Sequence, residues 1–273
     1  MMGTLDLGPE ARAEILEVFA HAVSTAGAII LAHRARGYTV ETKADLSPVT
    51  VADRESEAAI LSEVRRLLGD IPVVAEETGG KPLPGFNPAK PFLVIDPIDG
   101  TKEFIEGRSE FTVNLALIVN RRPEIGVIYA PALESLFVGS AGEAWTGWLD
   151  PGQTLTALRG KRALRCRVPE TERFVAVASR KHLDPETRAF LDDLPGDECI
   201  FRGSSIKFCI IADGQADLYP RFAPTSEWDT AAGEAILTAA GGSVRDLFGK
   251  PLTYGKTDTN FLNPGFVARG RAE

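Results

Sequence analysis

Apolar residues recur at intervals of three and four in the first part of the chain. Within residues 10–36 they form one stripe, made of Ile15, Val18, Phe19, Ala22, Val23, Ala26, Ile29 and Ile30. This spacing is typical of an amphipathic helix that buries one face, and Gly37 supplies a stop signal. A second helix is predicted after Thr50, because Ile60, Leu61, Val64 and Leu67 repeat the pattern before Gly69.

The middle of the chain changes to short apolar runs between turn residues, which indicates β-strands. A short buried strand is predicted over residues 71–75, and the run at residues 92–95 predicts another that stops at Asp96. Between them, the Gly- and Pro-rich residues 78–91 predict a mobile loop. Further strands are expected at residues 112–119, 126–129 and 135–138, with a strand pair within residues 139–149.

Helices and strands are mixed in the second half of the chain. Strands are predicted at residues 174–178, 216–219, 243–247 and 265–268, and helices at residues 205–212 and 229–240. Charged, Gly-containing sequence at residues 152–167 is a candidate boundary, so we expect an N-terminal region over residues 1–150 and a C-terminal region over 151–273. The pattern favours a layered α/β protein with helices on both sides of its sheets.

Composition narrows the function classes. The 273 residues carry 30 Lys and Arg against 38 Asp and Glu, a net charge of −8, which disfavours broad nucleic-acid binding because phosphates would be repelled. No uninterrupted run of about 20 apolar residues occurs, so no transmembrane helix is expected. Cys166, Cys199 and Cys209 are widely spaced, which favours reduced thiols in a cytosolic protein over a disulfide framework or a zinc site.

The most informative stretch runs from Asp96 to Thr101, with the sequence Asp-Pro-Ile-Asp-Gly-Thr. A buried strand ends there in two acids three residues apart, and Gly-Thr begins a helical turn. Carboxylates this close repel unless a cation lies between them, and Mg²⁺ prefers such oxygen ligands. The backbone N–H groups of a helix start bind anions, so a metal and a phosphate are expected side by side. The alternative is a polar turn with an Asp cap.

Other acids lie at the ends of predicted elements. Glu76 and Glu77 follow the strand at residues 71–75, while Asp53 and Asp229 lie at helix starts. Each has a simpler explanation, because the helix dipole favours an acid in the first turn and a loop glutamate is ordinarily solvated. Four acidic clusters at element ends together favour a site for more than one metal ion.

These motifs resemble those of the inositol monophosphatase superfamily in order and spacing. The resemblance rests on residues 47–53 (Ser-Pro-Val-Thr-Val-Ala-Asp), Glu76-Glu77, residues 96–101 and residues 227–233 (Glu-Trp-Asp-Thr-Ala-Ala-Gly). Four further blocks, at residues 101–104, 110–115, 203–209 and 216–221, are similar to the CysQ branch, the 3′(2′),5′-bisphosphate nucleotidases. The resemblance implies the layered α-β-α-β-α sandwich of the inositol monophosphatase or sugar phosphatase fold.

The resemblance also implies two or three Mg²⁺ ions held mainly by the N-terminal region. By the family pattern Glu76 binds one ion, Asp96 bridges two, the backbone carbonyl of Ile98 joins the first site, and Asp99 with Asp229 holds the second. Inhibition by Li⁺ in place of one Mg²⁺ is a further implication.

Catalytic and substrate-binding roles follow from the same resemblance. Asp53 and Thr101 match the pair that orients and deprotonates the attacking water. The residues expected at the substrate are Glu76, Gly100, Thr101, His182, Ser204, Lys207 and Arg221, of which Gly100 and Thr101 bind the scissile phosphate through their amides. At residues 179–182 this chain has Ser-Arg-Lys-His where the branch more often has Ser-Arg-Ser-His.

The implied function is Mg²⁺-dependent hydrolysis of the 3′-phosphate of adenosine 3′,5′-bisphosphate, which leaves AMP and serves sulfate assimilation. Three alternatives remain open: a phosphatase for inositol or other sugar monophosphates, a haloacid-dehalogenase phosphatase, and a non-catalytic protein that binds nucleotides through metal ions. The haloacid-dehalogenase motif places its acids at i and i+2, whereas here they lie at i and i+3. We expect a cytoplasmic monomer or homodimer, with contact to the inner membrane surface left open.

Overall fold

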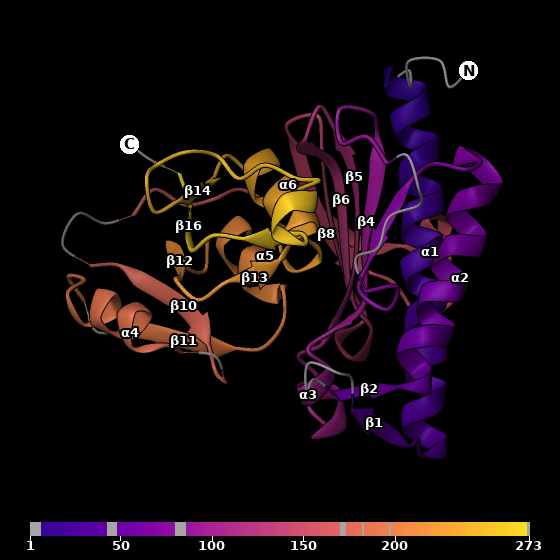
Figure 1. Ribbon diagram of the computed structural model, residues 1–273, viewed down its shortest axis with the longest axis horizontal. Helices are drawn as coiled ribbons and strands as arrows, with labels where there is room; N and C mark the ends of the chain where they lie inside the picture. Colours follow the sequence, from indigo (N-terminus) through magenta and orange to yellow (C-terminus); the bar gives the residue numbers. More distant parts are fainter. Residues whose placement is uncertain are drawn as a thin grey trace.

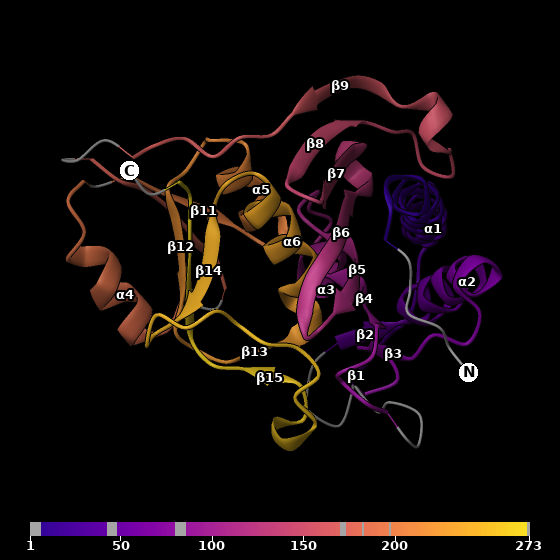
Figure 2. The same cartoon turned by 90° about the horizontal axis from the view of Figure 1, so that it is seen from above.

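Helices and sheets alternate in five layers in the computed structural model, which describes residues 7–42, 48–79, 86–169, 173–181, 183–196 and 198–271. The order of layers is a helix pair, a seven-stranded sheet, a second helix pair, a five-stranded sheet and one outer helix (Figures 1 and 2). The helices are α1 (Pro9–Arg36) with α2 (Val51–Leu68), α5 (Ile206–Ala212) with α6 (Ala231–Ala239), and the outer α4 (Pro185–Asp192). This confirms the expected α-β-α-β-α sandwich.

The seven-stranded sheet has the order β3-β4-β5-β6-β7-β8-β9. Its strands are β3 (Val73–Ala75), β4 (Phe92–Asp99), β5 (Thr112–Val119), β6 (Arg122–Ala130), β7 (Ser135–Ser140), β8 (Glu143–Trp148) and β9 (Arg159–Ala163). All neighbours are antiparallel except β3 and β4. The segment expected to be a boundary contains β9, which pairs with β8, so this sheet continues beyond residue 150. The division of the chain at that residue stays a prediction.

The five-stranded sheet has the order β11-β10-β12-β16-β14. Its strands are β10 (Val175–Ser179), β11 (Glu198–Arg202), β12 (Leu218–Arg221), β14 (Ser243–Asp246) and β16 (Phe266–Arg269). The sequence did not predict α4 or β11, because both are short and carry charged residues. The smaller elements are α3 (Thr101–Ile105), the ribbons β1 (Val40–Thr42) with β2 (Pro48–Thr50) and β13 (Thr225–Ser226) with β15 (Leu262–Asn263), and the 3₁₀ turns η1 (Pro131–Leu133), η2 (Leu155–Ala157), η3 (Glu227–Asp229) and η4 (Thr257–Thr259).

Several element boundaries differ from the sequence prediction, and two of the differences affect the acidic residues of the site. The strand expected to stop at Asp96 continues as β4 to Asp99. The helix expected from residue 229 is divided into the turn η3 and the helix α6, because Thr230 between them has φ −123°. Of the loop predicted to be mobile, residues 80–85 lie outside the described residues.

Helix α1 covers the seven-stranded sheet together with α2, and it contacts β5 and β6 (Figure 2). The predicted apolar stripe is its buried face, which includes Phe19, Val23 and Ile30. By length and composition alone α1 is apolar enough to cross a membrane, and 50% of its most apolar 18-residue stretch is buried within the structure. The expectation that the chain lacks a transmembrane helix therefore stays a prediction.

Helix α6 packs on the opposite face of the same sheet, so closely that no Cβ atom fits between its backbone and two strands. A Cβ at Gly126 of β6 would lie 2.5 Å from the Ala232 carbonyl oxygen, and one at Gly139 of β7 would lie 2.4 Å from Ile236 Cα. Glycines on adjacent strands therefore allow the helix backbone to contact the sheet directly. This contact fixes the position of η3, which immediately precedes α6 and carries Asp229.

We predict that Gly139→Ala destabilises the protein by about 1–3 kcal/mol, because the added methyl group forces α6 away from the sheet. Chemical denaturation of the two proteins measures this. Gly270→Ala is the matched control, since a Cβ there would lie 3.4 Å or more from its neighbours. Equal losses of unfolding free energy in both variants would contradict the close packing of α6.

Candidate functional site

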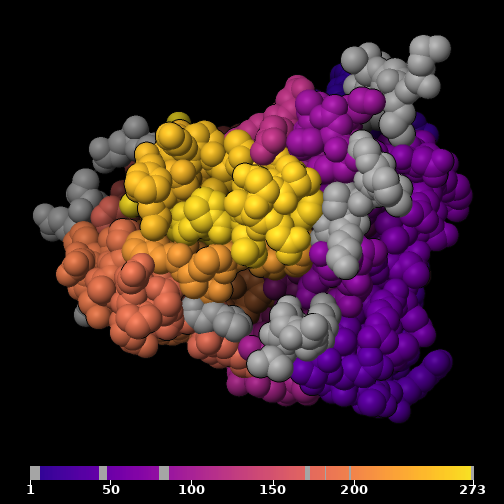
Figure 3. All heavy atoms as spheres, viewed as in Figure 1, coloured from indigo at the N-terminus to yellow at the C-terminus, as the bar shows by residue number. Residues whose placement is uncertain are grey.

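A cleft of about 630 Å³ opens between the end of β4 and the C-terminal half of the chain. The surface is hollowed where these two parts meet (Figure 3). Its lining includes ten of the residues predicted for the site: Glu76, Asp96, Ile98, Asp99, Gly100, Thr101, Ser204, Lys207, Arg221 and Asp229. Segments separated by more than 100 residues thus converge on one cleft, as the motifs predicted.

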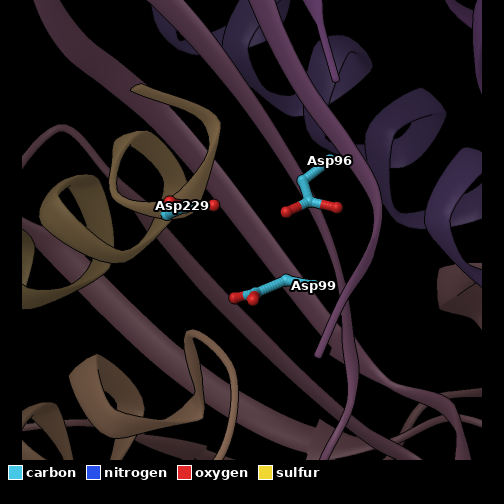
Figure 4. A group of neighbouring side chains, drawn as sticks. All are labelled: Asp96, Asp99 and Asp229. Carbon is cyan, nitrogen blue, oxygen red and sulfur yellow. The ribbon is translucent and has the colours of Figure 1, made fainter. Parts of the chain in front are cut away.

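The centre of the cleft is an acidic cluster. One carboxylate oxygen each from Asp96, Asp99 and Asp229 lies within 4.8 Å of the others (Figure 4). The first two come from β4 and the third from η3, so the seven-stranded sheet and the α6 layer both contribute. Asp96 is only 1% exposed, while Asp99 and Asp229 are half-buried.

A β-bulge explains how acids three residues apart reach the same cluster. In a regular strand, residues i and i+3 point to opposite faces of the sheet. Here Asp96 pairs with Asn114 and Asp99 pairs with Thr112, so β4 has one residue more than β5 between these pairs. The extra residue restores the common face, and the Ile98 amide donates to Asp96 Oδ1 at 3.0 Å within the bulge.

Burial and mutual repulsion disfavour negative charge in this cluster. The pKa of Asp96 lies well above its ordinary value, first because of burial and then because of the charges of Glu76, Asp99 and Asp229. The pKa of Asp229 is raised to about 8, again first by burial and then by Asp99 and Glu76. A cation among these oxygens would reverse both effects, because it favours the charged carboxylates.

The donors fit a hard divalent cation. Every ligand the cluster offers is a carboxylate oxygen, which is the chemistry that Mg²⁺ and Ca²⁺ prefer. The Asn114 side-chain oxygen beside them is buried without a hydrogen-bond partner in the described chain. It can therefore accept a hydrogen bond from a water molecule bound to the cation.

Glu76 and Glu77 have different surroundings. Glu76 follows β3, which runs parallel to β4, and its amide donates to the Ile95 carbonyl at 3.3 Å, so its side chain lines the cleft beside Asp96. The Glu77 amide donates instead to the carboxylate of Glu57 at 3.0 Å. Glu57 is a buried acid on α2 that the sequence analysis missed; its place one turn after Asp53 was the available signal.

Asp53 and Thr101 lie at the starts of two helices. Asp53 is buried in the first turn of α2, where its Oδ2 accepts hydrogen bonds from the Thr50 amide at 2.8 Å and the Thr50 hydroxyl at 2.7 Å. The simpler explanation of Asp53 as a capping residue therefore holds, and it is not among the described residues that line the cleft. Thr101 does line the cleft, and its hydroxyl donates to the Ile98 carbonyl at 3.0 Å.

Gly100 and Ser204 bring the two halves of the molecule into contact. Gly100 precedes α3 with φ +89°, and a Cβ there would lie 3.3 Å from Ser204 Cβ. Lys207 is buried, donates from Nζ to the Ser204 carbonyl, and lies 5.1 Å from the centre of the Tyr219 ring. Burial lowers its pKa to about 8, although the charge of Asp99 opposes the shift. His182 lies outside the described residues.

Comparisons with known proteins identify the family. The sequence model of the inositol monophosphatase family matches residues 11–268. The chain is 43% identical to the 3′(2′),5′-bisphosphate nucleotidase CysQ of Shigella flexneri and 42% identical to that of Escherichia coli K12, in each case over 83% of this chain and 87% of the relative.

Solved structures give the same result. CysQ of Bacteroides thetaiotaomicron is similar with a TM-score of 0.78 and 37% identity, covering 96% of this chain and 98% of that one. The inositol monophosphatase of Thermotoga maritima is similar with a TM-score of 0.70 and 25% identity, covering 96% and 92%. The resemblance drawn from the motifs is confirmed, and the chain belongs to the inositol monophosphatase family.

Proposed function

We propose that this protein hydrolyses the 3′-phosphate of adenosine 3′,5′-bisphosphate with the aid of Mg²⁺, releasing AMP and phosphate. One observation carries the proposal: the cleft places an acidic cluster, the Gly100-Thr101 turn and two basic side chains, Lys207 and Arg221, within one cavity. A bisphosphate needs cations beyond the reaction centre, whereas a monophosphate does not. The names of the CysQ relatives support the same substrate, and sulfate assimilation is the process we assign to it.

The cation would be held by Glu76, Asp96, Asp99 and Asp229, with the Ile98 carbonyl as a backbone ligand. The fit of these oxygens supports Mg²⁺, and the family pattern supports two or three ions. When bound, Mg²⁺ supplies the positive charge that acidifies water near neutral pH and stabilises the phosphoryl oxygens.

The remaining residues bind phosphate and move a proton. The Gly100 and Thr101 amides lie where the turn begins and would donate to the scissile phosphate. The Thr101 hydroxyl carries one proton, and in the structure it donates this proton in a hydrogen bond to the Ile98 carbonyl oxygen. To pass a proton from water to Asp53, this hydroxyl must rotate away from that carbonyl. Water then forms the new P–O bond, and the bond from phosphorus to the ribose 3′ oxygen breaks, with this oxygen taking a proton from solvent water as it leaves.

Lys207 and Arg221 would bind the second phosphate together with Ser204, and His182, which lies outside the described residues, keeps the substrate-binding role implied by the family pattern. Lys207 is held by the Ser204 carbonyl, so its charge lies at a defined position in the cleft. We place the reaction in the cytoplasm, which the free thiols of Cys166, Cys199 and Cys209 support. Whether the protein is a monomer or a homodimer, and whether it contacts the inner membrane, stay predictions.

The substrate is tested by measuring phosphate release from adenosine 3′,5′-bisphosphate and from inositol 1-phosphate, each with Mg²⁺ and with EDTA. We expect turnover only with Mg²⁺, and a kcat/KM at least about tenfold higher for the nucleotide, because a lost charge–phosphate contact costs about 1.4 kcal/mol or more. A preference for the inositol ester would identify a sugar-phosphate phosphatase. Binding of the nucleotide without phosphate release would identify a non-catalytic protein.

Asp96→Asn should reduce kcat at least about 100-fold, because the amide replaces a carboxylate at the centre of the cluster. The fold should persist, since the substitution preserves shape and removes a charge that burial disfavours. Phosphate release and circular dichroism measure the two effects. Asp150→Asn, an exposed acid paired with Arg159, is the control and should retain full activity. Substantial turnover by the Asp96 variant would refute its role.

The pH dependence of substrate binding tests Lys207. Its pKa of about 8 means that the ammonium is charged below that pH and neutral above it. The KM for adenosine 3′,5′-bisphosphate should therefore rise by up to about tenfold between pH 7 and 9. Adenosine 3′-monophosphate, which lacks the second phosphate, and the Lys207→Met variant should both show a flatter profile. Equal slopes for the two substrates would contradict the assignment.

A further inference from the structure

A buried hydrogen-bonded junction lies against the acidic cluster and is made by Asn114 and Ser205. Asn114 Nδ2 donates to Ser205 Oγ at 2.9 Å and approaches Asp99 Oδ2 at 3.4 Å. Ser205 Oγ in turn contacts Asp99 Oδ2 and lies 2.8 Å from the backbone oxygen of Asp229. Two predicted metal ligands are thus joined by one serine hydroxyl.

The junction connects the two halves of the molecule. Asn114 is in β5, where it is directly opposite Asp96 of β4, while Ser205 precedes α5 and lies between the sheets. Asn114 is 1% exposed and Ser205 is 2% exposed. A buried polar pair at the junction of two layers costs free energy unless its hydrogen bonds are made, so these side chains constrain the geometry around them.

Proton counting defines what the junction does. The Ser205 hydroxyl accepts from Asn114 and has one proton to donate, whereas two acceptors, Asp99 Oδ2 and the Asp229 carbonyl, lie within reach. The Ser205 proton can bind only one of these oxygens at a time, and the Asn114 amide, which has a second N–H, lies 3.4 Å from the same Asp99 oxygen. Ser205 and Asn114 together thus limit rotation of the Asp99 carboxylate and keep the Asp229 backbone beside it.

We propose that Ser205 and Asn114 are positioning residues, which hold Asp99 and Asp229 at the separation that a divalent cation requires and thereby set the affinity for this cation. The inference rests on the proposed metal site but adds two residues to which neither the motifs nor the family resemblance assigned a role. Groups that orient metal ligands typically contribute 10- to 100-fold in metal affinity or activity. Free carboxylates in this cluster would otherwise turn away from one another.

The test is isothermal titration calorimetry of Mg²⁺ into the full-length protein without substrate. Ser205→Ala should bind Mg²⁺ about tenfold more weakly than the unaltered protein. Ser24→Ala is the matched control, because this serine is also buried and donates to a backbone carbonyl, that of Asp150 at 3.2 Å, but lies outside the cleft. Its Mg²⁺ affinity should not change.

Asn114→Ala provides a second, independent variant, and the double variant tests whether the two residues act as one unit. If the two residues act as one unit, the double variant should bind Mg²⁺ about as weakly as either single variant. If they act independently, the two losses of affinity would multiply. Thermal unfolding without metal shows that each variant folds. Unchanged Mg²⁺ affinity in both single variants, or multiplied effects in the double variant, would overturn the proposal.

Kinetics separate this inference from the proposed function. The Mg²⁺ concentration for half-maximal rate should rise about tenfold in Ser205→Ala, while the KM for adenosine 3′,5′-bisphosphate at saturating Mg²⁺ should stay within about twofold. If the unaltered protein hydrolyses the nucleotide but Ser205→Ala needs no additional Mg²⁺, the positioning role is wrong and the function stands. If Mg²⁺ binding depends on Ser205 but no nucleotide is hydrolysed, the function is wrong and the positioning role stands.

Discussion

Repulsion among carboxylates gathered in one cleft is the physical constraint on which this molecule depends. One carboxylate oxygen each from Asp96, Asp99 and Asp229 lies within 4.8 Å of the others, and burial raises the pKa of Asp96 and Asp229 further. Such a cluster disperses unless rigid elements hold it or a cation neutralises it. The surrounding structure supplies the rigidity, and the proposed function depends on the neutralisation.

Part of this rigidity comes from backbone contacts. The bulge in β4 turns two acids to the same face, and the close contact of α6 with Gly126 and Gly139 positions the turn that carries Asp229. A displacement of either element would separate the acids. Packing at positions remote from the cleft is therefore linked to the chemistry through the position of Asp229, which lies between the two layers.

Structural roles and proposed functional roles coincide at several acids of the site. Asp53 caps α2 through Thr50, and Asp229 accepts a hydrogen bond from the Ser226 amide at 2.8 Å at the start of η3. The structure is thus compatible with both explanations of these acids, as residues that cap a helix start and as members of the site expected from the motifs. A helix cap fixes the rotamer of its carboxylate, which is also what a metal ligand or a base needs.

The sequence by itself determined the helix pair α1 and α2, most strands of the first sheet, the family, and the acids of the cleft, because hydrophobic periodicity and motif spacing are local properties. It placed the end of β4 at Asp96 and one continuous helix from Asp229, and it missed β11 and the hydrogen bond between Asn114 and Ser205. Only the tertiary structure decided these features. A bulge is defined against a partner strand, and Asn114 meets Ser205 across 91 residues, so neither contact leaves a local pattern.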